Sequence, residues 1–355
     1  MFSFLPVMAD DVHVLPSQNG IVLNVYYNDT DDSVSQTVQV AKVKLLTGEN
    51  KGETLVLENM LTGNPSYDIK LKRGVKVTLH AEETEDGIEY SIEDINRAGT
   101  LVWLSLIFCG LLVYVGKRKG LYSLVSIVLT VLLITHCLSP LILAGISPVF
   151  ATLSVCILST VATMYLVGGF NAKSTSASLG AILSLIFASI LSYLVMLSAH
   201  LTGFAGEYTL FLYSSHPELD FISITIAAMI LATLGAVMDV SMSIASTINE
   251  IHITDESKSV KELFISGMNV GRDIIGTMAN TLILVYLGGS LQLLLLANNI
   301  DMNKFFNLNQ VVTEISSALI GSIAIVICVP FTAIVAAAMI HRYGREVKLE
   351  TINID

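Results

Sequence analysis

Charged residues are scarce in this sequence. Asp, Glu, Lys and Arg make up 14% of the 355 residues, whereas an ordinary soluble domain has about 25%. That shortage, together with a hydrophobic content of 53%, excludes a soluble enzyme. Basic residues are fewer than acidic ones: the chain has 19 Lys and Arg and 30 Asp and Glu, which gives a formal net charge of −11. Nucleic acid recognition needs a basic surface, so DNA and RNA are excluded as partners.

Cysteines are few, and the common catalytic motifs are missing. All four cysteines lie in apolar segments, so we expect no disulfide framework and interpret them as small apolar side chains of a helical bundle. No HExxH, Walker A or GxSxG motif occurs. The loop 200–220 holds two His and three acidic residues, but their spacing fits no metal motif, which favours a solvated loop. We therefore expect neither enzymatic activity nor a cofactor or metal.

Long runs without a charged side chain are present instead. Residues 98–116 carry no charge, and neither do the 53 residues between Lys119 and Lys173. A helix across a hydrocarbon core of ~30 Å needs about 20 apolar residues, so the longer run holds two crossings, separated near Gly145. The sequence predicts a polytopic domain, 99–355, with seven transmembrane helices at 100–116, 121–143, 147–168, 175–199, 221–247, 274–297 and 315–340.

The basic residues between these spans indicate the orientation. With the N-terminal region outside, ten Lys and Arg residues fall in cytoplasmic segments and only Lys304 falls in an exterior loop. Basic residues concentrate on the cytoplasmic side of membrane proteins. The pattern therefore predicts an exterior N-terminal domain and a cytoplasmic C-terminus.

The N-terminal region, 1–98, has the pattern of a β-domain. Short apolar runs alternate with turn residues, at 21–27, 36–46, 53–59, 74–80 and 88–92. Five short strands predict a small all-β, barrel-like domain. The opening MFSFLPVMADD lacks both the length of a span and a basic n-region. We therefore expect that the true start lies upstream, that the N-terminus has been trimmed, or that the tail crosses by another route.

Two polar stripes interrupt the apolar spans. Asp239 is the one charged residue between 221 and 249, and such a residue at a helix centre costs about 2.5–3.5 kcal/mol on insertion scales. Its helical face continues with Ser243, Ser246 and Glu250. The second stripe, leading into the next span, consists of Asn269, Asp273, Thr277 and Asn280, with Arg272 beside it. Because the two helices are consecutive and antiparallel, we expect the stripes to face each other.

The stripes favour a relay for protons or cations. Asp239 would be the titrating carboxylate, with Asn280 and Thr277 as hydrogen-bonding partners. Arg272 or Asp273 would lie at the cytoplasmic mouth. In the alternative interpretation, Asp239 is a structural anchor and Arg272 and Asp273 simply lie at the membrane interface. An intramembrane aspartyl protease built on two such acids would need flanking sequences that do not appear.

Three long stretches carry a resemblance to a known family. They are TGENKGETLVLENMLTGNPSYDIKLKRGVKV, LGAVMDVSMSIASTINEI and ELFISGMNVGRDIIGTMANTLILVYLGGSLQLLLL. From Lys42 onward the chain resembles the YibE/F family, which implies a multi-pass protein of the bacterial plasma membrane and names no activity. Members usually begin with an additional transmembrane helix before the barrel, and the opening of this sequence departs from that pattern. The last three predicted spans show a weaker resemblance to the SecD/SecF export subunits and the resistance-nodulation-division superfamily, which couple proton flow to work.

Together these patterns predict a membrane all-α bundle of about seven helices preceded by a small exterior all-β domain. The leading hypothesis for its function is an ion- or proton-coupled transporter or translocation device, with Asp239 at the coupling site. The alternative is a non-transporting envelope accessory protein whose exterior barrel binds a partner. The expected partners are the lipid bilayer, an unidentified small solute or ion, and either an exterior protein or further copies of the chain in a homo-oligomer.

Overall fold

The computed structural model describes residues 13–28, 37–66, 68–84 and 87–352. The chain forms two compact units, Met1–Leu111 and Leu112–Asp355, so the boundary between them falls inside the first helix. The opening segment, on which the expectations about the start of the chain depend, lies outside the described residues.

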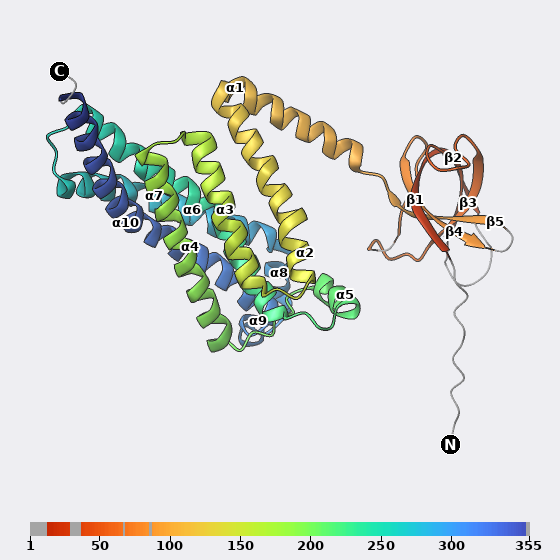
Figure 1. Ribbon diagram of the computed structural model, residues 1–355. Coiled ribbons are helices and arrows are strands. Elements are labelled where there is room, and N and C mark those ends of the chain that lie inside the picture. Colours follow the sequence, from red (N-terminus) through yellow and green to blue (C-terminus); the bar gives the residue numbers. More distant parts are fainter. Residues whose placement is uncertain (1–12, 29–36, 67, 85–86, 353–355) are drawn as a thin grey trace. The chain divides into compact units, whose positions relative to one another are not determined.

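Five antiparallel strands form the N-terminal barrel (Figure 1). They are β1 (His13–Asn28), β2 (Thr37–Leu45), β3 (Thr54–Leu61), β4 (Lys76–Thr84) and β5 (Gly87–Ile95). Their order in the sheet is β3-β2-β1-β4-β5, and the edge strands β3 and β5 also contact each other, so the sheet is nearly closed. Alternate side chains point inward, and Val22, Val43 and Leu79 are at most 1% exposed. The predicted barrel-like domain is confirmed.

Asp68 closes the loop that follows β3. Its carboxylate accepts hydrogen bonds from the Thr62 N–H at 2.6 Å, the Thr62 hydroxyl at 2.9 Å and the Gly63 N–H at 2.8 Å. Gly63 has a φ of +80°, which a residue with a side chain rarely adopts. Desolvation alone would raise the pKa of Asp68, but the hydrogen bonds from Thr62 and Gly63 outweigh it and hold that pKa below its ordinary value.

The first helix, α1 (Ala98–Leu133), departs from the prediction. Lys117 has a non-helical backbone, with φ 50° and ψ −129°, so α1 consists of two arms that meet at a bend (Figure 1). Next to the bend the backbone is tightly packed, because a Cβ on Gly120 would collide with the Leu112 carbonyl. The helix continues through η1 (Ile134–Leu138) and α2 (Ser139–Leu143).

Two of the predicted spans are therefore joined. The segments 100–116 and 121–143 form one apolar segment of 46 residues, Ala98–Leu143, because a single non-helical residue takes the place of the expected loop. The described residues contain six candidate membrane segments, and the longest of them, bent at Lys117, covers both of these predicted spans. Gly145, at φ +85°, and Pro148 separate the long segment from the next helix, as expected.

Four long helices form the core of the bundle. They are α3 (Pro148–Gly168), α4 (Ala172–Ser198), α6 (Phe221–Thr254) and α10 (Asn309–Ile352). Small residues let them pack closely: a Cβ on Gly180 of α4 would collide with Thr332 of α10. Cys156 and Cys328 are fully buried among these helices.

The helix α7 (Val260–Gly289) packs on one side of this core. It begins with a capping box between Ser259 and Glu262, well before the predicted span 274–297, and it ends before that span does. Its buried residues are Leu263, Gly267 and Gly271, which lie on one face.

The bundle has two ends (Figure 1). At one end lie the bend of α1 and the connection between α3 and α4; it is called the lysine end, because these segments contain Lys117 and Lys173 or adjoin them. The other, the loop end, holds the short elements α5 (Glu207–Ser215), α8 (Leu291–Leu296), η2 (Ala297–Asn299) and α9 (Met302–Phe306). At the loop end the Asn309 amide donates a hydrogen bond to the Phe204 carbonyl at 2.7 Å, which ties the start of α10 to the connection after α4.

Candidate functional site

Asp239 lies on the side of α6 that the bundle leaves exposed. The next two residues, Val240 and Ser241, are fully buried, whereas Asp239, Ser243 and Glu250 are exposed. The sequence places these polar residues on one helical face, and the structure puts that face outside the packed core. Placing a charged group in an apolar surrounding costs free energy unless the group is paired or solvated. The groups next to Asp239 therefore decide whether its carboxylate is stable there.

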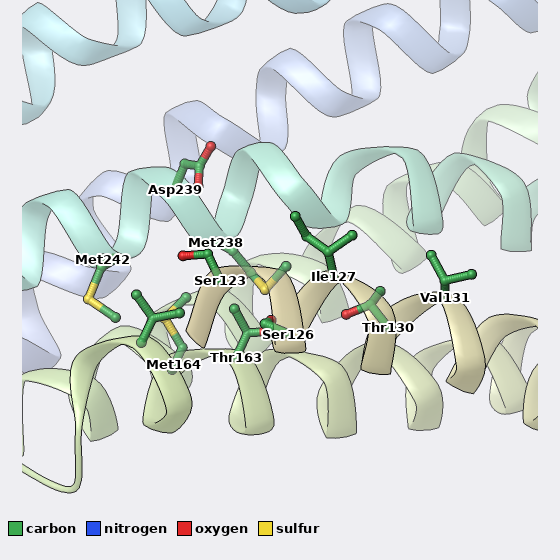
Figure 2. A pocket seen from close by; sticks show the side chains of 11 residues that line it. Ser123, Ser126, Ile127, Thr130, Val131, Thr163, Met164, Met238, Asp239 and Met242 are labelled. Atoms are coloured by element: carbon green, nitrogen blue, oxygen red, sulfur yellow. The ribbon is translucent and has the colours of Figure 1, made fainter. Parts of the chain in front are cut away.

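A cavity of about 370 Å³ lies beside Asp239, between α1, α3 and α6. Hydroxyl groups line it from two helices, and two of them form a hydrogen bond, since Ser126 Oγ lies 2.6 Å from Thr163 Oγ1. Methionines from α3 and α6 form its apolar wall. The lining includes Ser123, Ser126, Thr130, Thr163, Met164, Met238, Asp239 and Met242 (Figure 2).

Asp239 stands at the margin of this cavity. Figure 2 shows its side chain on the α6 ribbon, directed away from the row of hydroxyls on α1. Its carboxylate makes no hydrogen bond or ion pair with any residue that the structure describes. The Ser243 hydroxyl one turn on donates to the backbone carbonyl of Asp239 at 2.8 Å, not to the carboxylate.

The polar stripe of α7 does not face Asp239, so the predicted meeting of the two stripes is wrong. The glycines are the reason: Gly267 and Gly271 leave room for Ile248 of α6 and Val329 of α10, and this small-residue face packs on the core. The polar residues are exposed on other faces of α7. They are Asn269, Arg272, Asp273, Thr277 and Asn280.

Within the α7 stripe, the hydrogen bonds are local. Arg272 Nη1 donates to Asn269 Oδ1 at 2.9 Å, and the Thr277 hydroxyl donates to the Ile274 carbonyl at 3.0 Å. No described residue is hydrogen-bonded or ion-paired to the side chains of Asp273 and Asn280. The relay partners expected for Asp239 are thus not beside it.

Glu314 is a second carboxylate of the bundle, and the sequence analysis missed it. The predicted seventh span begins at Ile315, whereas α10 begins at Asn309, so Glu314 lies inside the helix. Glu314 and Tyr286 of α7 line two cavities, of about 350 and 420 Å³. The Ser290 side chain is hydrogen-bonded to Glu314, and the buried Tyr286 hydroxyl has no hydrogen-bond partner in the described chain. The sequence did contain a signal for this residue, because Glu314 directly precedes the predicted span 315–340.

Metal-binding geometry is not found in the described residues. They contain no group of three or more His, Cys, Asp or Glu side chains close enough to hold a metal ion. In the loop 200–220, His216 contacts Glu218 at 3.1 Å, and both side chains are partly exposed.

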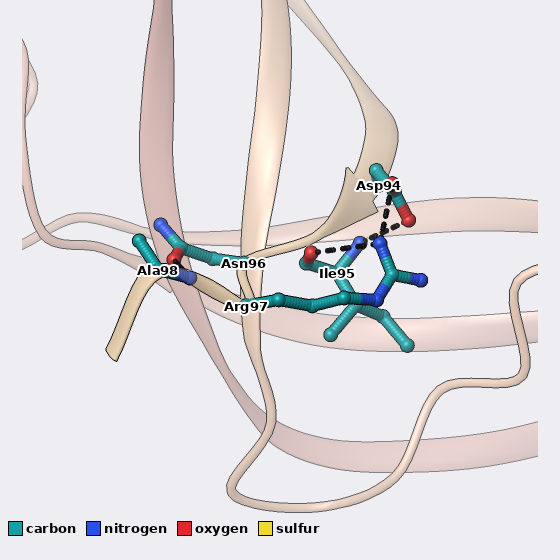
Figure 3. Close-up of polar contacts among 5 residues, drawn as sticks. All are labelled: Asp94, Ile95, Asn96, Arg97 and Ala98. Carbon is teal, nitrogen blue, oxygen red and sulfur yellow. Dashed lines mark hydrogen bonds and ion pairs between the residues drawn. The ribbon is translucent and has the colours of Figure 1, made fainter. Parts of the chain in front are cut away.

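The junction of the barrel with α1 is held by short polar contacts (Figure 3). Arg97 Nη1 donates to Asp94 Oδ2 at 2.6 Å and to the Ile95 carbonyl at 3.4 Å. The Asn96 side chain accepts a hydrogen bond from the Ala98 N–H at 3.1 Å, where α1 begins. The hydrogen bond from Arg97 holds the pKa of Asp94 below its ordinary value. These contacts fix the direction in which the chain leaves β5.

Comparison with known protein families gives two matches. The family described as YibE/F-like protein matches residues 104–342, which is most of the helical region. The YibE/F family N-terminal domain matches residues 22–95, which is the barrel. No curated protein and no solved structure matches the chain.

Proposed function

The chain belongs to the YibE/F family, and from that premise we propose that it is a proton- or cation-coupled membrane carrier with Asp239 as its coupling carboxylate. The observation that carries the proposal is an unpaired carboxylate within a candidate membrane helix, at the edge of a hydroxyl-lined cavity. Acidic residues inside membrane segments often mark ion pathways or proton relays.

The position of Asp239 along α6 supports this role. It lies 18 residues after Phe221, which is roughly 27 Å at 1.5 Å per residue. A hydrocarbon core is ~30 Å thick, so a helix that enters the core at Phe221 brings Asp239 close to its other edge, at the lysine end. An ion released there would enter the compartment on that side, which in this proposal is the cytoplasm, because the orientation expected from the basic residues places the lysine end there.

Glu314 supplies a carboxylate toward the loop end. It lies five residues after the start of α10, or roughly 8 Å along the axis. Two carboxylates near opposite edges of the apolar layer can take up an ion on one side and release it on the other. The hydroxyls of Ser126 and Thr130 lie on the α1 side of the cavity beside Asp239, where they can hold water or a cation between them.

Ion flux tests the proposal. The full chain is reconstituted in vesicles that contain a pH-sensitive dye, and proton uptake is followed under an imposed membrane potential. We expect flux in the wild type and only the leak of empty vesicles in Asp239→Asn. The matched control is Asp255→Asn. It removes a carboxylate that lies outside the candidate spans and accepts hydrogen bonds from Ser257. Equal flux in wild type and Asp239→Asn contradicts the assignment.

A second candidate is an accessory protein whose barrel binds an exterior partner. The observation in its favour is an apolar outer surface on the barrel, where Tyr26, Val56 and Met60 are 57%, 65% and 65% exposed. Deleting residues 13–95 while keeping the helices separates the two candidates. A carrier keeps its ion flux in that variant, whereas an accessory protein shows no flux in either form and loses its biological activity with the barrel.

A further inference from the structure

The outward face of α7 presents polar residues where lipid would lie. Only 6% of the most apolar part of α7 is buried, against 39–50% for α3, α4, α6 and α10. We define the outward face as Asn269, Arg272, Asp273, Gly276 and Asn280, all exposed and on the side of α7 away from Leu263, Gly267 and Gly271. The side of α7 that carries Leu263, Gly267 and Gly271 thus packs inside the bundle, and these polar residues lie outside it, beside exposed apolar side chains such as Ile265 and Leu287.

Lipid is a poor neighbour for this face. Asn280 lies nine residues before the end of α7 at Gly289, which is roughly 14 Å, or about half of a ~30 Å core. Its amide makes no hydrogen bond to any described residue. An amide at mid-membrane without a partner loses hydrogen bonds that nothing in the lipid replaces. A protein surface that supplies them is therefore expected here.

We infer that the outward face of α7 is the contact surface for a second copy of this chain. The charges on the face are the reason to choose a second copy. Arg272 and Asp273 lie on opposite flanks of a central row formed by Asn269, Gly276 and Asn280, as 100° per residue requires. Two copies inserted in the same orientation and related by a two-fold axis bring opposite flanks together.

In that arrangement the two charged residues and Asn280 find partners at their own depth. Arg272 of one copy lies beside Asp273 of the other, twice, and the two Asn280 amides meet across the axis. Gly276 allows the helices to approach, because no atom of the described chain lies within 4 Å of a Cβ placed on it. Asp273, which has no ion pair among the described residues, gains one. This inference rests on α7 alone and is independent of ion transport.

The test counts the copies of the full chain in liposomes by single-molecule photobleaching of fluorescently labelled protein, over a series of protein-to-lipid ratios. We expect wild-type protein to bleach in two steps at dilutions where chance co-capture is rare. Asn280→Leu should weaken the dimer by about tenfold, the size of one interhelical hydrogen bond. The control, Tyr193→Leu, changes an exposed side chain of α4 and should leave the dimer unchanged.

Charge reversal makes the test specific. Arg272→Asp and Asp273→Arg each place like charges opposite one another and should give monomers, whereas the double reversal restores opposite charges and should restore dimers. Circular dichroism of each variant checks that the helices are intact. A monomeric wild type overturns the inference. So does a dimer that survives both Asn280→Leu and the single reversals, or a folded double reversal that remains monomeric.

Discussion

Replacing Gly271 with alanine is expected to loosen α7 from the core. A Cβ at this position would collide with Cγ1 of Val329 and lie 3.1 Å from Ile244. Both neighbours are fully buried, and Val329 is β-branched and stiff, so neither can move aside cheaply. Overpacking of this kind costs about 1–3 kcal/mol.

Helix propensity acts in the opposite direction and has to be separated. Alanine stabilises a helix relative to glycine by about 1 kcal/mol. The stability change of Gly271→Ala alone would therefore underestimate the free-energy cost of the collision. Gly235→Ala in α6 is the matched control, because no atom lies within 4 Å of a Cβ there. The difference between the two variants cancels the propensity and leaves about 1–3 kcal/mol for the contact.

The assay is reversible unfolding of the purified chain in mixed micelles, with helical content followed against denaturant. We expect Gly235→Ala to be as stable as the wild type or more so, and Gly271→Ala to be less stable than Gly235→Ala by the stated amount. Equal stability of the two variants would refute the packing of α7 on Val329 and Ile244.

Three further predictions concern other parts of the chain. Glu314→Gln should abolish the ion flux of the wild type, because it removes the carboxylate near the loop end; unchanged flux would exclude Glu314 from the pathway. The lowered pKa of Asp68 means that its contribution to barrel stability is complete above its unfolded-state value of about 3.9 and is lost as the pH falls through the lower folded value. Hydrogen exchange in the loop after β3 should therefore accelerate in acid, and Asp68→Asn should accelerate it already at neutral pH; an Asp68→Asn loop as protected as wild type would be inconsistent. A small maleimide that partitions into the micelle should label the exposed Cys137 in detergent and leave the buried Cys156 and Cys328 unlabelled until the protein unfolds; equal rates would contradict the packing of α3 and α10.

Much of the fold follows from patterns that act along one segment. Charge-free runs locate the membrane helices, and alternating apolar residues with turn signals locate the strands. These patterns did not predict the bend of α1. The basic residues around Lys117 indicate an interruption, but the sequence pattern does not distinguish a loop from the single non-helical residue that the structure has there.

The candidate site shows the same limit. Spacing alone correctly grouped the polar residues of α6 and of α7 into two stripes, but it could not tell which face of α7 would pack. Gly267 and Gly271 decide that, because close packing against Ile248 and Val329 outweighs any pairing of the stripes. The hydroxyls beside Asp239 come from α1 and α3, helices distant in sequence, so their arrangement is a property of the tertiary structure.

The most direct test of the account is proton flux through reconstituted protein with three side chains at position 239. Aspartate should conduct, glutamate should keep a measurable part of that flux because it retains the carboxyl group, and asparagine should reduce it to the leak of empty vesicles. Flux that is unchanged in Asp239→Asn would contradict the claim that Asp239 couples ion movement in this protein.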